Sequence, residues 1–376
     1  MKKVVVALFA AVLALSLAAC GQKKTYEIAL ITDKGNIDDK SFNQGSWEGV
    51  VEFAEENKIS HKYYKPEEAS DAGYLAAIDL AVKGGAKVIV TPGFLFEVPI
   101  FQAQTKYPEV KFILLDGAPH TADYKTFRTD ANVASIMYAE EQSGYLAGYA
   151  AVKDGMTKLG FMGGMAVPAV QAFGYGFLRG AEDAAAELNV SVSVQYHYTG
   201  NFDANDTNKA TAKAMYQSGV EVIFACGGSV GKSVMAAALE DGKKVIGVDV
   251  DQRYDSTTVI TSAMKGLSAS VVQVLEAIYN EQWSTFGGKQ TYFNAANDGI
   301  GLPTTVIGNA SGNAFDRFTS FNKAQYDVVF AKLVAGTVSG LKRTITVANK
   351  NGYATAAELT NATTGLNLVK VTVTVI

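Results

Sequence analysis

The sequence predicts an α/β protein built from two doubly wound parallel-sheet lobes with a ligand cleft between them. Short apolar runs alternate with amphipathic segments almost without interruption, which is typical of a parallel sheet covered by helices. The alternation restarts near residues 130–135 and produces a second set of similar size. The 376 residues, 48% of them hydrophobic, are enough to form two cores.

The first half contains four predicted strands, at 28–31, 62–64, 87–90 and 112–115. Helix-period segments between them predict helices over 44–56, 72–83 and 96–106. A later helix is predicted over 134–152, with small residues on one face: Ala139, Gly144, Ala147, Gly148 and Ala151. Such a face indicates close packing against a neighbouring helix or a crossing between the lobes.

The second half repeats the pattern, with predicted strands at 158–162, 190–198, 222–225 and 244–248, and helices at 169–188, 205–217 and 230–239. A strand at 259–261 and a helix over 267–281 are expected to return to the first lobe. We therefore predict a first lobe of 27–132 plus about 259–297, and a second lobe of 133–258 plus about 298–340. The tail, 341–376, ends in an alternating strand-like segment from 367 whose place the sequence does not give.

The N-terminus predicts a lipid-anchored protein on the extracytoplasmic face of a bacterial cell membrane. Residues 1–3 are basic at two positions, and 4–17 form an apolar run too short for a stable span. Small residues then precede Cys20, as in a bacterial lipobox, where cleavage leaves a lipidated cysteine; the alternative is an ordinary signal peptide. Residues 21–26 would form a tether, and Cys226, in an apolar strand, is expected to be buried and inert.

Composition argues against several other classes of function. The formal net charge of −4 argues against nucleic-acid binding, which usually requires a basic surface. We find no helix-turn-helix motif, so a transcriptional regulator is not expected. The three histidines, His61, His120 and His197, are far apart, so a histidine-based zinc site or catalytic triad is not expected. We predict no cofactor and no metal ion.

The turn at 31–44 is the most chemically dense stretch of the chain. Asp33, Asp38 and Asp39 resemble the calcium-holding aspartate cluster of nucleoside hydrolases, but Ile31 stands where the leading aspartate belongs. Calcium needs six to eight oxygen ligands, so this set falls short. Asp38 or Asp39 is instead expected to cap a turn, and Ser41 to cap the following helix.

A second stretch, 227–233, looks like a phosphate loop. The Walker pattern would need a glycine at position 226, where this chain has Cys226, so a nucleotide-hydrolysing role is rejected. Gly227 and Gly228 still permit close approach of the backbone to a ligand, with a tight turn as the alternative.

Together these stretches resemble the basic membrane protein (BMP) family of lipoprotein substrate-binding components of ABC transporters, whose characterised type is a purine nucleoside receptor. The likeness covers roughly residues 25–300 and rests on 32–44, 47–49, 114–116, 163–164 with 168, 173–177, 227–228, 247–252 and 261–265. It implies a fold like that of type I periplasmic binding proteins.

The resemblance also implies a set of ligand-binding residues. Phe42 and Phe173 would stack on a purine base, and Asn43 and Asp116 would read its edge. Asp249 would take both ribose hydroxyls. The remaining first-rank candidates are Lys265 on the ribose, Asp33 on the first-lobe wall and Gly227 beside the ligand. The secondary candidates are Phe202, Gly228 and Asp251. For Asp251 the alternative is a structural role.

The resemblance implies that the protein binds a ligand and does not catalyse a reaction. A monomer would bind adenosine, guanosine or inosine in the cleft, close its lobes and dock on the permease subunits of an ABC transporter. Two alternatives remain open: a binding protein of the same architecture for a sugar or autoinducer, and a calcium-dependent nucleoside hydrolase.

Overall fold

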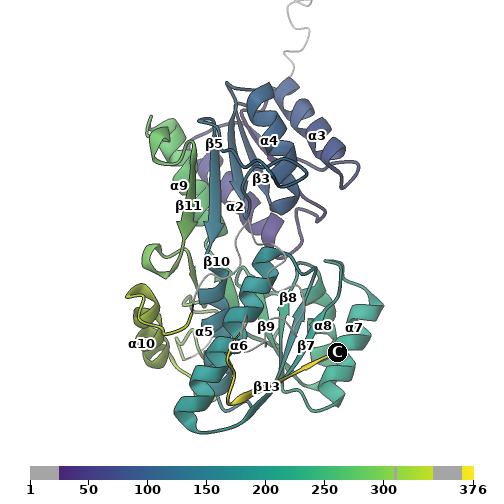
Figure 1. Ribbon diagram of the computed structural model, residues 1–376, viewed down its shortest axis with the longest axis vertical. Coiled ribbons are helices and arrows are strands. Elements are labelled where there is room, and N and C mark those ends of the chain that lie inside the picture. The colour runs from purple at the N-terminus through teal and green to yellow at the C-terminus, as the bar shows by residue number, and fades with distance from the viewer. Residues whose placement is uncertain (1–24, 309–310, 342–365) are drawn as a thin grey trace, which may run out of the picture.

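A computed structural model describes residues 25–308, 311–341 and 366–376, and the chain forms two α/β lobes stacked along its long axis (Figure 1). Within these residues, no helix is long and apolar enough to span a membrane. The predicted lipidation site at Cys20 and most of the tether lie outside the described residues.

The first lobe, the upper one in Figure 1, has a sheet of parallel strands in the order β11-β5-β4-β3-β1-β2. Alternate strand residues face opposite layers: Ile28 and Leu30 pack with helices α2 and α9, and Ala29 and Ile31 with α3 and α4. The elements are β1 (Ile28–Ile31), α2 (Phe42–Glu56), β2 (His61–Tyr64), α3 (Asp71–Lys83), β3 (Val88–Pro92), α4 (Glu97–Lys106), β4 (Lys111–Leu115), β5 (Val133–Tyr138), α9 (Leu267–Tyr279) and β11 (Lys289–Phe293).

The second lobe has a sheet in the order β12-β10-β9-β8-β6-β7-β13, parallel except for β12. Helices α5 and α6 cover one face, and α7 and α8 the other. The elements are α5 (Glu140–Lys153), β6 (Lys158–Gly163), α6 (Pro168–Leu188), β7 (Val192–Tyr198), α7 (Asp206–Gln217), β8 (Val222–Cys226), α8 (Val230–Asp241), β9 (Lys244–Asp249), β10 (Val259–Lys265), β12 (Ile300–Gly301), α10 (Lys323–Val334) and β13 (Val371–Val375). The predicted pair of doubly wound lobes is confirmed.

Two of the predicted lobe boundaries need correction. Strand β5 pairs with β4 in the first-lobe sheet, so the chain leaves that lobe after Tyr138 and not at 133. Strand β10 pairs with β9 in the second lobe, so the chain returns at Gly266 and not at 259. A third crossing joins β11 to β12. An apolar run predicts a strand but does not identify its neighbour, which is why the boundaries were misplaced.

The helix predicted over 134–152 is in fact a strand followed by a helix. All six residues of β5 are buried because it lies between two strands and under helices on both faces, and α5 begins only at Glu140. The prediction about its small residues holds: α5 packs closely on α6. A Cβ placed on Gly148 would lie 2.0 Å from the carbonyl oxygen of Phe177 on α6.

The end of the chain belongs to the second lobe. Strand β13 adds to the edge of the sheet beside β7, as the yellow segment of Figure 1 shows. The buried carboxylate of Glu182, on α6, accepts the backbone N–H groups of Val369, Lys370 and Val371 at 2.9–3.0 Å. These hydrogen bonds hold the alternating segment that begins at residue 367 at the edge of the second-lobe sheet.

Replacing Gly148 with alanine should destabilise the protein, because the methyl group would collide with backbone and separate α5 from α6. We expect a loss of about 2 kcal/mol or more in the free energy of unfolding, measured by urea denaturation. Gly231→Ala is the matched control: this glycine also lies in a helix, but its added methyl would have no neighbour closer than 3.7 Å, so stability should stay level or rise by up to about 1 kcal/mol. Equal losses in the two variants would refute the close helix contact.

Candidate ligand-binding site

One cavity lies between the lobes, at the carboxyl ends of strands from both sheets. It holds about 910 Å³ of empty space, counting its open mouth. All eight first-rank predicted residues line it, and so do Phe202 and Gly228: Asp33, Phe42, Asn43, Asp116, Phe173, Phe202, Gly227, Gly228, Asp249 and Lys265. The structure thus brings these side chains together, while their contact with a ligand stays a prediction.

The turn at 33–43 is held by Asp39, which caps α2. Its buried carboxylate accepts the backbone N–H groups of Ser41, Asn43 and Gln44 at 2.8–3.1 Å. Ser41, the cap predicted from sequence, makes no capping hydrogen bond; its hydroxyl instead donates to Asp249 across the cleft. Asp39, three residues before the first helical residue Phe42, reaches the N–H groups of the first turn, which is why a pattern centred on Ser41 misassigned the cap.

Asn43 is committed to its own lobe. Its amide donates both N–H groups, to Asp33 at 2.8 Å and to Asp39 at 2.9 Å, and its oxygen accepts the backbone N–H of Asp33 at 3.1 Å. Both N–H groups thus hold Asp33 and Asp39, so contact with the edge of a base is limited to the second lone pair of the amide oxygen. The base-reading role of Asn43 stays a prediction. Burial raises the pKa of Asp33 to about 6, against the lowering effect of hydrogen bonds from Gly35 and Asn43.

Two further carboxylates end strands at equivalent places in the two lobes. Asp116 follows β4 and Asp249 ends β9, and both have a left-handed backbone, with φ of 55° and 66°. Aspartate tolerates this conformation better than most residues, and such strained positions cluster at functional sites. Oδ1 of Asp116 is buried and accepts no hydrogen bond from any described residue.

Lys265 is the centre of the cavity's electrostatics. Its buried ammonium pairs with Asp116 and lies 3.4 Å from Oε1 of Glu140 and 3.9 Å from Oδ1 of Asp249. It also sits 4.8 Å from the ring centre of Phe42. Burial would lower the pKa of this lysine, but the carboxylates raise it above its ordinary value, so Lys265 is a fixed cation.

Burial and the neighbouring charges also shift the pKa values of two of the carboxylates around Lys265. Burial raises the pKa of Asp116 to about 7; Lys265 opposes this rise and Glu140 reinforces it. Burial also raises the pKa of Asp249, again against Lys265. Asp116 therefore gains negative charge as the pH rises through neutrality, and a donor from a ligand would favour that charge.

The aromatic walls differ from the prediction in one respect. Phe173 is only 1% exposed, and its ring packs on Phe224 with centroids 5.8 Å apart. Phe202, on the loop after β7, is only partly buried, and its ring covers Gly164, where an added Cβ would lie 2.4 Å from the ring. Phe202 therefore presents ring surface to the cavity from the second lobe, and Phe173 forms part of its floor.

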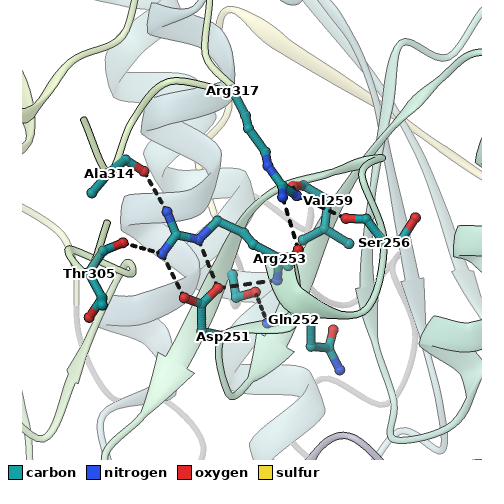
Figure 2. Close-up of polar contacts among 9 residues, drawn as sticks. Asp251, Gln252, Arg253, Ser256, Val259, Thr305, Ala314 and Arg317 are labelled. Carbon is teal, nitrogen blue, oxygen red and sulfur yellow. Dashed lines mark hydrogen bonds and ion pairs between the residues drawn. The ribbon is translucent and has the colours of Figure 1, made fainter. Parts of the chain in front are cut away.

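Asp251 does not line the cavity, and its structural alternative fits. Figure 2 shows its carboxylate paired with the guanidinium of Arg253, at 2.6 and 2.8 Å. Arg253 also donates to the carbonyls of Thr305 and Ala314, and Arg317 donates to those of Arg253, Ser256 and Val259. This network fastens the segment after β12 to the second lobe.

Gly227 and Gly228 stand where the backbone needs a residue without a side chain. A Cβ on Gly227 would lie 2.7 Å from the backbone nitrogen of Gly164, so these two loops could not approach with a larger residue there. Gly228 has φ of 53°, which favours glycine. Cys226 is buried beside them, and burial raises the pKa of its thiol, as expected for an inert cysteine.

Sequence reasoning missed several lining residues. Glu140 is the most important, and it was hidden inside the helix wrongly predicted from 134. Lys34, Gly35, Pro168 and Val248 fell within the family motifs but were assigned no role. The remaining lining residues without a predicted role are Gly93, Phe94, Met137, Val167, Ala169, Val170 and Ser229.

The fold and the cavity define a two-lobed solute-binding protein. The sequence matches, over residues 27–329, the family described as ABC transporter substrate-binding protein PnrA-like. The chain belongs to this family, which confirms the resemblance noted from sequence. ABC transporter substrate-binding proteins act on the extracytoplasmic side of the membrane.

Individual relatives agree with this assignment. The chain is 30% identical over 368 residues to the ABC transporter nucleoside-binding protein BmpA of Lactococcus lactis subsp. cremoris (strain MG1363), covering 89% of this chain and 99% of that protein. It is 32% identical over 300 residues to basic membrane protein D of Borreliella burgdorferi (strain JD1), covering 78% and 84%. Among solved structures, a solute-binding protein from Aeropyrum pernix K1 has the same fold, with a TM-score of 0.72 at 24% identity, covering 83% and 92%.

Replacing Asp39 with alanine should destabilise the first lobe, because three backbone N–H groups and the amide of Asn43 lose their acceptor. We expect a loss of about 1–3 kcal/mol in the free energy of unfolding. Asp38→Ala is the matched control: its side chain is exposed, and the change should stay within about 0.5 kcal/mol. If both variants unfold at the same urea concentration as wild type, Asp39 is not the cap.

Proposed function

We propose that this protein captures purine nucleosides in the interlobe cavity and delivers them to an ABC transporter permease, held to the membrane by a lipid on Cys20. The observation that carries this proposal is that Phe42 of one lobe and Phe202 of the other both line the cavity, together with several carboxylates and the buried ammonium of Lys265. A flat base needs aromatic faces, and its N–H groups and the ribose hydroxyls need acceptors.

The base would lie between Phe42 and Phe202. Asp116 is placed to accept an N–H from its edge, because its Oδ1 is buried and accepts no hydrogen bond from the described residues. Burying that atom beside a ligand without a donor would cost about 1–3 kcal/mol, which favours ligands that supply one. Asp33, held by Asn43, is a second acceptor on the same lobe.

The ribose would meet Asp249 and Lys265. Oδ2 of Asp249 already accepts the hydroxyl of Ser41, so Oδ1 is the atom left for a ribose hydroxyl. The expectation from the sequence was that Asp249 accepts both ribose hydroxyls, one on each carboxylate oxygen. We now propose that only Oδ1 of Asp249 accepts a ribose hydroxyl. Lys265 would donate to a second ribose oxygen.

Contacts across the mouth support capture by lobe closure. Nε2 of Gln252 donates to the carbonyl of Lys40 at 2.7 Å, and Nζ of Lys232 donates to that of Asp38 at 3.2 Å. The side chain of Lys40 lies 3.7 Å from Asp255. These contacts join the turn of the first lobe to helix α8 and to the segment after β9 in the second lobe, as a closed binding protein requires. We propose that the protein acts as a monomer and performs no chemistry.

Thermal shift and calorimetry with a panel of ligands test the proposal. Adenosine, guanosine and inosine should raise the melting temperature and bind one per chain, and 2′- and 3′-deoxynucleosides should bind more weakly. Free pentoses and hexoses are the comparison set. A response to sugars alone would support the sugar-binding alternative, and release of free ribose from inosine in calcium would support a hydrolase; either result would overturn the proposal.

Replacing Phe202 with alanine should weaken nucleoside binding, because one face of the base loses its aromatic partner. We expect a cost of about 1–3 kcal/mol in binding free energy, measured by calorimetry. Tyr254→Ala is the control: this aromatic is also on the second lobe, but it is 65% exposed and does not line the cavity. Unchanged affinity in Phe202→Ala would remove this residue from the site.

A further inference from the structure

Glu140 is a cavity residue to which neither the family likeness nor the motifs assigned a role. It is fully buried and is the first residue of α5, directly after the first crossing between the lobes. Its carboxylate lies 3.4 Å from the ammonium of Lys265, which ends β10 at the second crossing. The crossings are joined nearby: the hydroxyl of Ser143 donates to the carbonyl of Met264 at 3.0 Å.

The other two partners of Lys265 come from different places. Asp116 follows β4 of the first lobe, and Asp249 ends β9 of the second, next to β10. The contact with Asp116 therefore spans the lobes, whereas Glu140 and Asp249 both belong to the second lobe together with Lys265. Of these two carboxylates, Glu140 lies nearer the ammonium of Lys265, at 3.4 Å against 3.9 Å for Asp249.

We propose that Glu140 is a positioning residue that holds the Lys265 ammonium at the crossings and leaves Asp116 and Asp249 available to the ligand. This inference rests on the proposed nucleoside site. A buried ammonium needs its full complement of acceptors. Without the charge of Glu140, Lys265 would pair more fully with Asp116 and Asp249, and a ligand donor would have to displace it.

The charged and titratable groups around this centre come from several elements of both lobes. They are Asp33 and Lys34 after β1, Asp39 before α2, Asp116 after β4, Tyr138 of β5, Cys226 of β8 and Asp249 of β9, together with Glu140 and Lys265. Asp116, whose pKa is about 7, accepts a donor from the ligand more strongly when it is ionised. Nucleoside affinity of the wild type should therefore fall as the pH drops from 8 through 7, with a further fall near 6 from Asp33.

The test is calorimetric titration of inosine into wild type and Glu140→Gln between pH 8 and 5. At pH 8 the variant should bind about tenfold more weakly. Removing the charge of Glu140 lowers the pKa of Asp116, so the fall in affinity near pH 7 should move to lower pH while the one near 6 remains. Glu141→Gln is the matched control, because Glu141 is buried on the same turn but does not line the cavity.

Two further variants separate positioning from a structural role. In a Lys265→Met background, Glu140→Gln should cause no additional loss of affinity, because Glu140 acts through Lys265. Glu140→Asp, which keeps the charge, should restore part of the affinity even if both variants melt below the wild type.

The possible outcomes bear on different claims. If wild type binds inosine but Glu140→Gln matches it in affinity and pH profile, or the losses add in the Lys265→Met background, the inference on Glu140 is wrong. If wild type binds no nucleoside, the proposed function itself fails.

Discussion

The buried ammonium of Lys265 is the interaction on which the site depends. A lysine removed from water is stable only with counter-ions, and here Asp116, Glu140 and Asp249 surround it. These residues come from one lobe, a crossing and the other lobe, so the charge balance of the cavity is tied to the relative position of the lobes. A cavity with more carboxylates than cations also disfavours anionic ligands and suits a neutral one with several donors.

The fold delivers these groups through the ends of parallel strands. Asp33, Asp116, Asp249 and Lys265 each stand at or just beyond the carboxyl end of a strand, and two sheets facing each other bring those ends to one cavity. The left-handed backbone at Asp116 and Asp249 is retained in both lobes, which is the kind of strain that functional sites keep. Asp39 and Asn43 then fix the turn that carries Phe42.

The sequence predicted this convergence better than it predicted the local hydrogen bonds. The family resemblance pointed to Asp116 and Asp249, and both stand at ends of strands that periodicity predicts. The apolar run at 133–138 was misassigned because small residues continue into the helix behind it. That error hid Glu140. The caps, the hydrogen bonds of Asn43 and the deeper burial of Phe173 compared with Phe202 depend on distances between side chains that no spacing in the sequence encodes. The placement of β13 likewise depends on Glu182, far away in the chain.

The central claim is that the closed cavity holds one purine nucleoside. Native mass spectrometry of the protein purified without added ligand tests it most directly, since a closed binding protein tends to retain its ligand. The account predicts a one-to-one complex that releases, on denaturation, a small molecule with the mass and fragmentation of a purine nucleoside. A released hexose, a nucleotide, or a protein that stays ligand-free after incubation with all three purine nucleosides would contradict it.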